Sequence, residues 1–379
     1  MDAELNEDAA HVVVDTGSTM CRAGISGEDT PQSIFPTVVC RARRQEVSIG
    51  VGQKVSYVGH EAQSRRDVQT LRYPVENGII TNWHDMERIW YHIIYNELHV
   101  SPENQSILLT EAPLNPAANR EKMAEIMFES FNFPALCVGI QPVLSLYSSG
   151  RTTGIVLESG ENITRAVPIY EGFPLFHAVR QIPMGGRDLT EYLSNILREC
   201  DHQLAYMPEK AIIQDIKEKL CYVALDLDGD IKSGNENRYL RKVYELPDGQ
   251  CLTLGSERLR VPEALFRPSL AGFDVGGLHT LVYDSILKCD RDLHRELCGN
   301  IAVSGGTTMF SGISDRLNSE LIKLFPFRTR VRVLASPDRQ HAAWIGGSIV
   351  ASLSTFDKFC VTRGEYTDIG PAIVHRKRV

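Results

Sequence analysis

The chain has 379 residues, of which 43% are hydrophobic and 23% are charged. This length and composition predict a soluble globular protein with enough buried surface for two domains. With 40 basic and 48 acidic residues, the formal net charge is −8, which argues against broad nucleic-acid binding through charge and favours protein or small-molecule partners.

The cysteines and the apolar runs indicate the cellular compartment in which the protein is located. The nine cysteines lack CxxC and Cys/His zinc spacing, and several lie within apolar patterns, so we expect reduced, buried thiols. No apolar run reaches the length of a membrane span, and the acidic N-terminus is unlike a signal peptide. We therefore expect no membrane partner and a location in the cytoplasm, with the nucleus as an alternative.

The first predicted strand ends at an acidic residue. An apolar run over 12–14 leads into Asp15, and small residues follow over 16–19. Small side chains let successive backbone N–H groups converge on an anion. The carboxylate can bind the waters of a Mg²⁺ ion that neutralises phosphates. These residues therefore predict a phosphate-binding hairpin.

The next elements alternate without low-complexity linkers, so we expect crossings of the chain to join the domains. Residues 42–58 are polar, contain glycine and lack periodicity, which predicts an exposed hairpin with a mobile tip. Helical periodicity follows at 83–97 and 119–131, and again at 188–200 and 209–225.

The pattern of strand, acid and turn recurs at 154–162. There an apolar run ends at Glu158, and a second turn of small and polar residues follows. Either segment alone could be an ordinary hairpin with a polar tip. Because the three features recur in the same order, the pair predicts a nucleoside triphosphate held between two similar halves.

A third candidate for ligand binding lies at 301–310, where an apolar strand runs into Ser304-Gly-Gly and then Thr-Thr. Glycines let the backbone approach a ligand, and a threonine pair is typical of a helix start, whose dipole attracts anions. An ordinary glycine turn is the alternative.

Eight segments together resemble actin. They include Asp15-Thr-Gly-Ser-Thr-Met-Cys21 and Ser304-Gly-Gly-Thr-Thr-Met309, with 109–116, 119–123, 144–154, 215–225, 344–348 and 352–356. The resemblance covers nearly the whole chain without a large insertion or deletion. It implies an α/β fold shared by actin, Hsp70-type ATPases and sugar kinases, with two related domains around a nucleotide cleft.

The resemblance also implies four subdomains. Subdomain 1 would comprise 1–36, 74–148 and 342–379, and subdomain 2 would comprise 37–73 with its mobile loop at 42–58. Subdomain 3 would comprise 149–184 and 274–341, and subdomain 4 would comprise 185–273.

The resemblance assigns roles to individual residues. Catalytic roles would fall to Gln141, which orients the attacking water, and to Glu158. Asp15 and Glu158 would hold Mg²⁺ or Ca²⁺ through water. The nucleotide, ATP or ADP, would contact Gly17, Ser18, Thr19, Arg22, Ser159, Gly160, Glu161, Asn162, Ile163, Gly186, Lys217, Glu218, Gly305, Gly306, Thr307, Met309, Phe310 and Gln340. Lys217 and Glu218 could instead lie on a solvated helix face.

Several of these positions differ from the family. Arg22 stands for a lysine, Phe310 for a tyrosine and Gln340 for a lysine. The second turn has Glu158-Ser-Gly-Glu-Asn162 where the actin family has a sequence similar to Asp-Ser-Gly-Asp-Gly. Shortly after this turn, Arg165 replaces a family histidine that could relay a proton. Displacement of a reacting group by about 1 Å can cost roughly a hundredfold in rate. We therefore expect ATP binding with slow or altered hydrolysis.

Filament contacts can be assigned in the same way. The loop residues Gln45, Val47 and Ile49 would insert into the next subunit, against a cleft formed by Tyr147, Ile349, Val350 and Leu353, and Phe273 would belong to a plug between strands. Such a contact between identical copies does not close and builds a filament. The loop tip and the plug differ from the family, and Pro142 in the hinge could restrict the domain rotation of polymerisation.

Two functions remain open. The first is an ATP-binding cytoskeletal protein that assembles head-to-tail for motility and structure, with a weak ATPase and actin-binding partners such as myosin. The second is an actin-related subunit of an axonemal inner-arm dynein, dynactin or a chromatin remodeller, which would place it in the cilium or nucleus. A small-molecule kinase would need an acceptor site and a catalytic base, and the sequence supplies neither.

Overall fold

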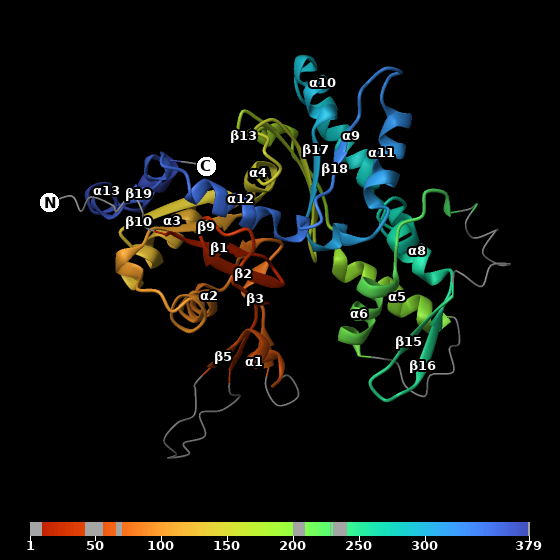
Figure 1. Ribbon diagram of the computed structural model, residues 1–379, viewed down its shortest axis with the longest axis horizontal. Coiled ribbons are helices and arrows are strands. Elements are labelled where there is room, and N and C mark those ends of the chain that lie inside the picture. The colour runs from red at the N-terminus through yellow and green to blue at the C-terminus, as the bar shows by residue number, and fades with distance from the viewer. Residues whose placement is uncertain are drawn as a thin grey trace. The chain divides into compact units, whose positions relative to one another are not determined.

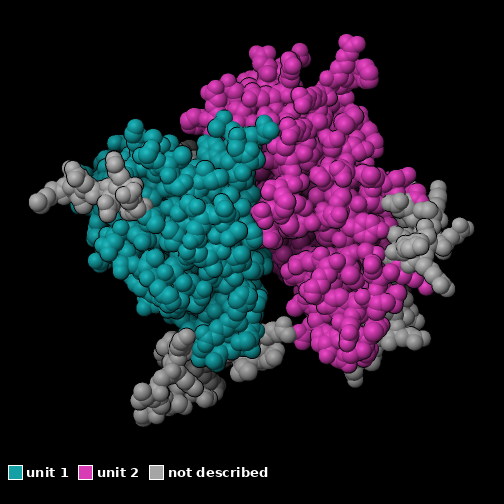
Figure 2. Space-filling model, viewed as in Figure 1, with its two compact units in different colours: residues 1–152, 341–379 teal, residues 153–340 magenta. Residues whose placement is uncertain are grey.

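The computed structural model describes residues 10–41, 56–65, 70–199, 209–227, 229 and 241–377 (Figure 1). The chain forms two compact units (Figure 2). Unit 1 comprises residues 1–152 and 341–379, and unit 2 comprises residues 153–340. The chain therefore passes between the units twice, after Thr152 and after Gln340, and the expected crossings are confirmed. The finer division into four subdomains stays a prediction.

Unit 1 is built on a six-stranded sheet with the order β19-β10-β9-β1-β2-β3. Strands β1, β2 and β3 form an antiparallel meander, and β9 and β10 continue the sheet parallel to β1. Every residue of β1 and β9 is buried, as expected for parallel strands with both faces covered. The strands are β1 (Val12–Thr16), β2 (Met20–Ile25), β3 (Ser33–Pro36), β9 (Ile107–Glu111), β10 (Ala135–Ile140) and β19 (Val361–Thr362).

Unit 2 repeats this plan. Its sheet has the order β13-β12-β11-β17-β18, and β14 pairs with β12. Strands β11, β12 and β13 form an antiparallel meander, and β17 and β18 continue it parallel to β11. The two candidate hairpins therefore occupy the same place in the two sheets. The strands are β11 (Gly154–Ser159), β12 (Thr164–Tyr170), β13 (Phe173–Pro174), β14 (Arg180–Ile182), β17 (Ile301–Ser304) and β18 (Val333–Leu334).

Helices and small sheets complete both units. Unit 1 contains α1 (Gly59–Gln63), α2 (Trp83–Tyr91), α3 (Ala117–Glu125), α4 (Gln141–Tyr147), α12 (Ala342–Ala351), α13 (Arg363–Ile369), β4 (Val39–Arg41), β5 (Ser56–Val58), β6 (Thr70–Arg72), β7 (Val75–Glu76) and β8 (Ile79–Ile80). Unit 2 contains α5 (Gly186–Glu199), α6 (Lys210–Leu220), α8 (Glu257–Glu263), α9 (Leu278–Leu287), α10 (Arg291–Gly299), α11 (Ile313–Leu324), β15 (Lys242–Glu245) and β16 (Cys251–Leu254).

Short 3-10 segments join these elements, and α2 and α3 continue as π-helices. The 3-10 segments are Pro102–Asn104, Phe176–Ala178, Pro268–Ala271, Gly306–Met309, Arg339–His341, Phe356–Lys358 and Pro371–His375, and the π-helices are His92–Glu97 and Ile126–Ser130.

The predicted helices at 83–97, 119–131 and 188–200 are present within one or two residues of the predicted bounds over the described chain. The predicted helix at 209–225 is too long, because α6 ends at Leu220 and Cys221 is extended. The Tyr222 N–H donates to the Arg258 carbonyl and the Val223 N–H to the Ser311 carbonyl. Tertiary hydrogen bonds therefore end this helix. Most of the predicted hairpin at 42–58 lies outside the described residues.

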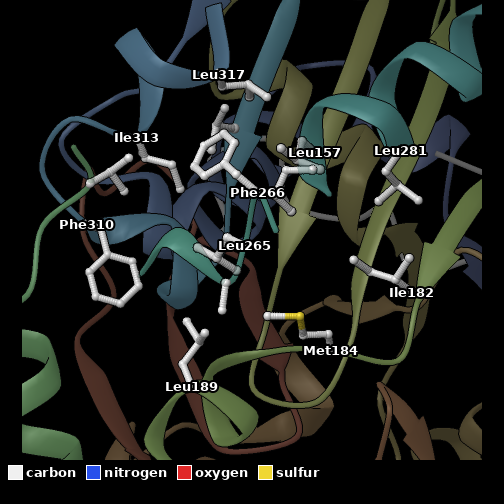
Figure 3. Close-up of a cluster of buried hydrophobic side chains, with 14 of the residues drawn as sticks. Leu157, Ile182, Met184, Leu189, Leu265, Phe266, Leu281, Phe310, Ile313 and Leu317 are labelled. Atoms are coloured by element: carbon white, nitrogen blue, oxygen red, sulfur yellow. The ribbon is translucent and has the colours of Figure 1, made fainter. Parts of the chain in front are cut away.

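The core of unit 2 lies between its sheet and its helices. Leu157 of β11 and Leu281 of α9 belong to it, together with Phe266 and Met184 (Figure 3).

Seven described cysteines are buried, and no disulfide joins the described ones. Cys251 is exposed, which corrects the expectation of a buried thiol at that position. Within the described ranges, no helix is long and apolar enough to span a membrane.

In unit 1, helices α4 and α12 cross at very close range. An added Cβ on Gly346 would lie 1.8 Å from the carbonyl oxygen of Leu144. Two residues earlier, Trp344 is fully buried, and its Nε1–H donates to the carbonyl of Val13 in β1 at 3.0 Å. The crossing therefore fixes α4, which begins at Gln141, against the strand that carries Asp15.

We predict that Gly346→Ala lowers the free energy of unfolding by ~3 kcal/mol, because the new methyl group forces α4 and α12 apart. Urea unfolding followed by circular dichroism measures this change. Gly364→Ala in α13 is the control, because its nearest neighbouring atom would lie 4.0 Å from the added Cβ. Equal stability of the two variants would contradict a tight crossing.

Candidate functional site

Asp15 lies at the end of β1 and is only 4% exposed. Its Oδ1 accepts hydrogen bonds from Thr110 Oγ1 at 2.7 Å and from Gln141 Nε2 at 2.9 Å. Its Oδ2 lies 3.3 Å from Nη1 of Arg22. Because β1, β9 and β10 are parallel neighbours, their carboxyl ends meet and bring these groups together.

The turn after Asp15 is held in place by hydrogen bonds that its carbonyl groups accept. Thr37 donates from its N–H to the Thr19 carbonyl at 2.8 Å and from its hydroxyl to the Gly17 carbonyl at 2.9 Å. The Ser18 hydroxyl accepts from the Gly78 N–H at 2.9 Å. Within the described chain, no group accepts a hydrogen bond from the N–H of Ser18 or Thr19. These two donors are available to an anion.

Arg22 stands directly opposite Asp15 in the register of β1 and β2. Besides its contact with Asp15, its Nε–H donates to Nδ1 of His341 at 2.9 Å. Sequence reasoning assigned no role to His341 or to Thr110. Thr110 was detectable as a polar residue near the carboxyl end of an otherwise apolar strand, whereas no sequence signal indicates that His341 lies beside Arg22.

The hairpin of unit 2 carries an equivalent pair. Glu158 stands opposite Arg165 in the register of β11 and β12. Burial lowers the pKa of the Arg165 guanidinium, and the charge of Glu158 acts against this shift. The Nε–H of Arg165 donates to Oε1 of Gln181 in β14 at 3.3 Å. Both hairpins therefore place an acid opposite an arginine at the same register.

The second turn is fixed by backbone contacts with two other segments of unit 2. The Gly160 carbonyl accepts from the Gly186 N–H at 2.9 Å and from the Thr307 hydroxyl at 2.7 Å. An added Cβ on Gly185 would lie 2.5 Å from the Glu161 carbonyl, and one on Gly305 would lie 2.3 Å from a backbone oxygen. Only glycine permits these approaches.

The other members of this turn face different partners. The Ser159 and Thr164 hydroxyls lie 2.7 Å apart, and the Gly160 N–H donates to the Ile163 carbonyl at 3.0 Å. No described residue accepts a hydrogen bond from the N–H of Glu161 or of Asn162. The second turn therefore also offers two backbone donors.

Lys217 of α6 is 4% exposed and points to the same region. Its ammonium group donates to the Gly186 carbonyl at 2.7 Å and to the Thr190 hydroxyl at 2.9 Å. Burial lowers the pKa of Lys217 and raises the pKa of Glu161, and the charge of each residue acts against the shift of the other. A solvated position is therefore wrong for Lys217, whereas Glu218 is exposed and accepts from Gln214 Nε2 at 2.9 Å.

The segment after β17 does not open an α-helix at Thr307 and Thr308, which corrects that prediction. These residues lie in the 3-10 segment Gly306–Met309, and α11 begins only at Ile313. The guanidinium of Arg339 donates through Nε and Nη2 to the Thr308 carbonyl at 3.1 and 2.9 Å, which holds the chain in a tight turn.

The remaining nucleotide candidates in unit 2 differ in exposure. Phe310 is 7% exposed and packs in the hydrophobic core (Figure 3). Met309 is 37% exposed, and Gln340 is exposed. An added Cβ on Gly306 would meet no atom within 4 Å, so this glycine borders open space.

The expected filament contacts are only partly described. Gln45, Val47 and Ile49 lie outside the described residues. Ile349 and Leu353 are 43% and 48% exposed, and Tyr147 and Phe273 are partly buried. Val350 is 4% exposed and packs in the core of unit 1. Its assignment to a surface cleft is therefore wrong, because it belongs to the same buried cluster as Leu144 of α4.

Each hairpin, taken by itself, fits a phosphate group. Each offers two backbone N–H groups and an arginine, which suit phosphate oxygens. Among the described residues, no cluster of three or more His, Cys, Asp or Glu side chains could bind a metal directly. A single carboxylate such as Asp15 or Glu158 could bind the waters of a cation, which suits Mg²⁺ because this ion keeps several waters.

We predict that Thr110→Val lowers the free energy of unfolding by ~2 kcal/mol, because the buried Asp15 carboxylate loses a donor. Urea unfolding provides the measurement. Thr367→Val is the matched control, since the exposed Thr367 hydroxyl donates only to the Arg363 carbonyl, and its effect should stay within ~0.5 kcal/mol. Similar losses in both variants would contradict a structural role for the Thr110–Asp15 bond.

Comparison with known families agrees with these observations. The family model described as Actin matches residues 6–379, nearly the whole chain. The mixed α/β architecture is consistent with the actin-type ATPase fold. The predicted resemblance and fold class are thus confirmed, and the chain belongs to the actin family.

Proposed function

We propose that this actin-family chain binds ATP together with Mg²⁺ or Ca²⁺ and hydrolyses it slowly. Proteins of this family generally bind a nucleotide and a divalent cation. The observation that carries the proposal is the arrangement at Asp15. Its buried carboxylate is oriented by Thr110, Gln141 and Arg22, beside a turn with two available N–H donors.

Each group in this arrangement has a role in the proposal. The N–H groups of Ser18 and Thr19 bind phosphate oxygens, and Arg22 adds a cation whose Nη2 group has no acceptor among the described residues. When bound, the divalent cation neutralises phosphate charge. Asp15 holds its water shell, and its orientation is fixed before the nucleotide binds, which lowers the entropic cost of binding.

Gln141 is the candidate for orienting the attacking water. Its Nε2 donates to Asp15 Oδ1 at 2.9 Å and lies 3.3 Å from the Thr16 carbonyl and from the Thr110 hydroxyl. These contacts use the amide nitrogen and leave Oε1 to accept a hydrogen bond from water. The orientation of Gln141 is thus set by the same carboxylate that would hold the cation.

Slow hydrolysis follows from the second hairpin. Arg165 is 6% exposed and stays cationic, opposite the longer acid Glu158. An arginine does not accept a proton near neutral pH, whereas a histidine can. The pair therefore offers electrostatic stabilisation without a proton relay.

We predict that the double variant Glu158→Asp with Arg165→His releases phosphate at least ~10-fold faster than the wild type, because it restores a group able to transfer protons. A phosphate-release assay at saturating ATP measures the rates. The control is Glu199→Asp with Arg198→His, the same two changes at exposed positions of α5.

Two results would contradict this proposal. Wild-type turnover as fast as that of the double variant would remove the claim of slow hydrolysis. Failure of the purified wild type to bind ATP at ~1 mM, the upper range of common nucleotide affinities, would remove the claim of nucleotide binding.

We also propose that the chain assembles head-to-tail into cytoskeletal filaments for motility and structure, in the cytoplasm, with itself and with actin-binding proteins such as myosin as partners. Two exposed apolar side chains, Ile349 at the end of α12 and Leu353 just after it, support this proposal. The alternative is a subunit that does not polymerise, within an axonemal inner-arm dynein, dynactin or a chromatin remodeller. The burial of Val350 reduces the available apolar contact and favours this alternative.

We predict that the protein pellets in Mg²⁺, K⁺ and ATP at ~50 μM, well above the ~1 μM dissociation constant of a moderate contact. Ile349→Asp with Leu353→Asp should abolish the pellet, because a carboxylate would be buried against the next copy. Ile369→Asp is the control, because Ile369 is an apolar residue of unit 1 with a similar exposed fraction, 46%. A soluble wild type that binds ATP would favour the subunit function.

A further inference from the structure

The arginines of the two hairpins share a feature that the family does not require. In each, the Nε–H donates to a side chain from outside the hairpin. Arg22 donates to Nδ1 of His341 at 2.9 Å, and Arg165 donates to Oε1 of Gln181 at 3.3 Å. The first contact is shorter and connects the best-formed phosphate turn to a distant part of the chain.

Two contacts on different edges hold the guanidinium of Arg22. Nη1 lies 3.3 Å from Asp15 Oδ2 on one edge, and Nε bonds His341 on another. The Arg22 side chain is 14% exposed, and no described residue accepts a hydrogen bond from its Nη2. The plane of the guanidinium is therefore fixed while Nη2 stays available to a ligand.

The chain that follows His341 is held by contacts with β1 and α4. His341 ends the 3-10 segment Arg339–His341, and α12 follows directly. Helix α12 is anchored to β1 by the bond from Trp344 to the Val13 carbonyl, and to α4 by the close approach at Gly346. His341 and the hairpin that carries Arg22 are thus attached to the same strand, β1.

We propose that His341 is a positioning residue that orients Arg22 toward the phosphate groups of the bound nucleotide. This inference rests on the proposed nucleotide-binding function. An unrestrained arginine loses rotamer freedom when it binds phosphate, whereas Arg22 is already ordered by His341 and Asp15. The Nε–H contact is specific to arginine, because the lysine that the family has at this position donates only from its terminal ammonium group.

A double-mutant cycle tests this role. ATP and adenosine affinities are measured by calorimetry for the wild type, His341→Leu, Arg22→Lys and the double variant. We expect His341→Leu to weaken ATP binding ~10–100-fold, as for loss of a hydrogen bond to a charged group, and to leave adenosine binding unchanged. In the Arg22→Lys background the same change should alter ATP affinity by less than ~2-fold, because the coupled contact is already gone.

Two further variants separate positioning from general stability. His341→Gln keeps an acceptor oxygen and should restore ATP affinity to within ~2-fold of the wild type, within the spread expected of neutral changes. His294→Leu in α10 is the control. The His294 ring nitrogen contacts the Cys289 carbonyl at 3.0 Å, and His294 is remote from the hairpins in sequence. The ratio of ATP to adenosine affinity should not change in this variant. If His341→Leu does not fold, His341→Phe takes its place, since it keeps a ring without the acceptor.

The outcomes are distinct. Equal loss of ATP and adenosine affinity in His341→Leu, or an undiminished effect in the Arg22→Lys background, would overturn the positioning role while leaving nucleotide binding intact. Unchanged ATP affinity in His341→Leu would do the same. Absence of ATP binding by the wild type would overturn the proposed function, and this inference with it.

Discussion

The candidate site of unit 1 depends on one buried carboxylate. A charge that is only 4% exposed is costly unless donors surround it. For Asp15 these donors come from three different elements: Thr110 from β9, Gln141 from α4 and Arg22 from β2. These contacts hold the ends of three neighbouring elements together at the candidate site, so we expect changes in stability and in the proposed function to be coupled here.

Unit 2 repeats the sheet but not the carboxylate environment. Glu158 occupies the position that corresponds to Asp15 and faces Arg165 in the same register as the first pair. The turn after Glu158 is held by the close approach of glycines from two neighbouring segments. The buried Lys217 donates a hydrogen bond to one of these segments. The contacts described above centre on a carboxylate in unit 1 and on a backbone turn in unit 2. This difference is consistent with the proposed ATP binding and slow hydrolysis.

The crossing of α4 and α12 links the site to the rest of unit 1. It places Gln141 at the end of β10 and supports His341 next to Arg22. Small residues are needed there because the helix backbones almost touch at Gly346. A packing contact remote from the hairpin in sequence therefore controls the geometry of two side chains in the proposed site.

The sequence by itself indicated the family and the α/β class through its resemblance to actin. Hydrophobic periodicity and turn residues, which act locally, predicted the two hairpins and four of the described helices. The sequence pattern made Asp15 a candidate site residue, and the resemblance added Arg22, Gln141 and Lys217 as candidates. Only the tertiary structure decided that α6 stops at Leu220, that Val350 is buried, and that Thr110 and His341 join the site. These features depend on contacts between residues far apart in the chain, such as Arg22 and His341, and local sequence patterns therefore do not predict them.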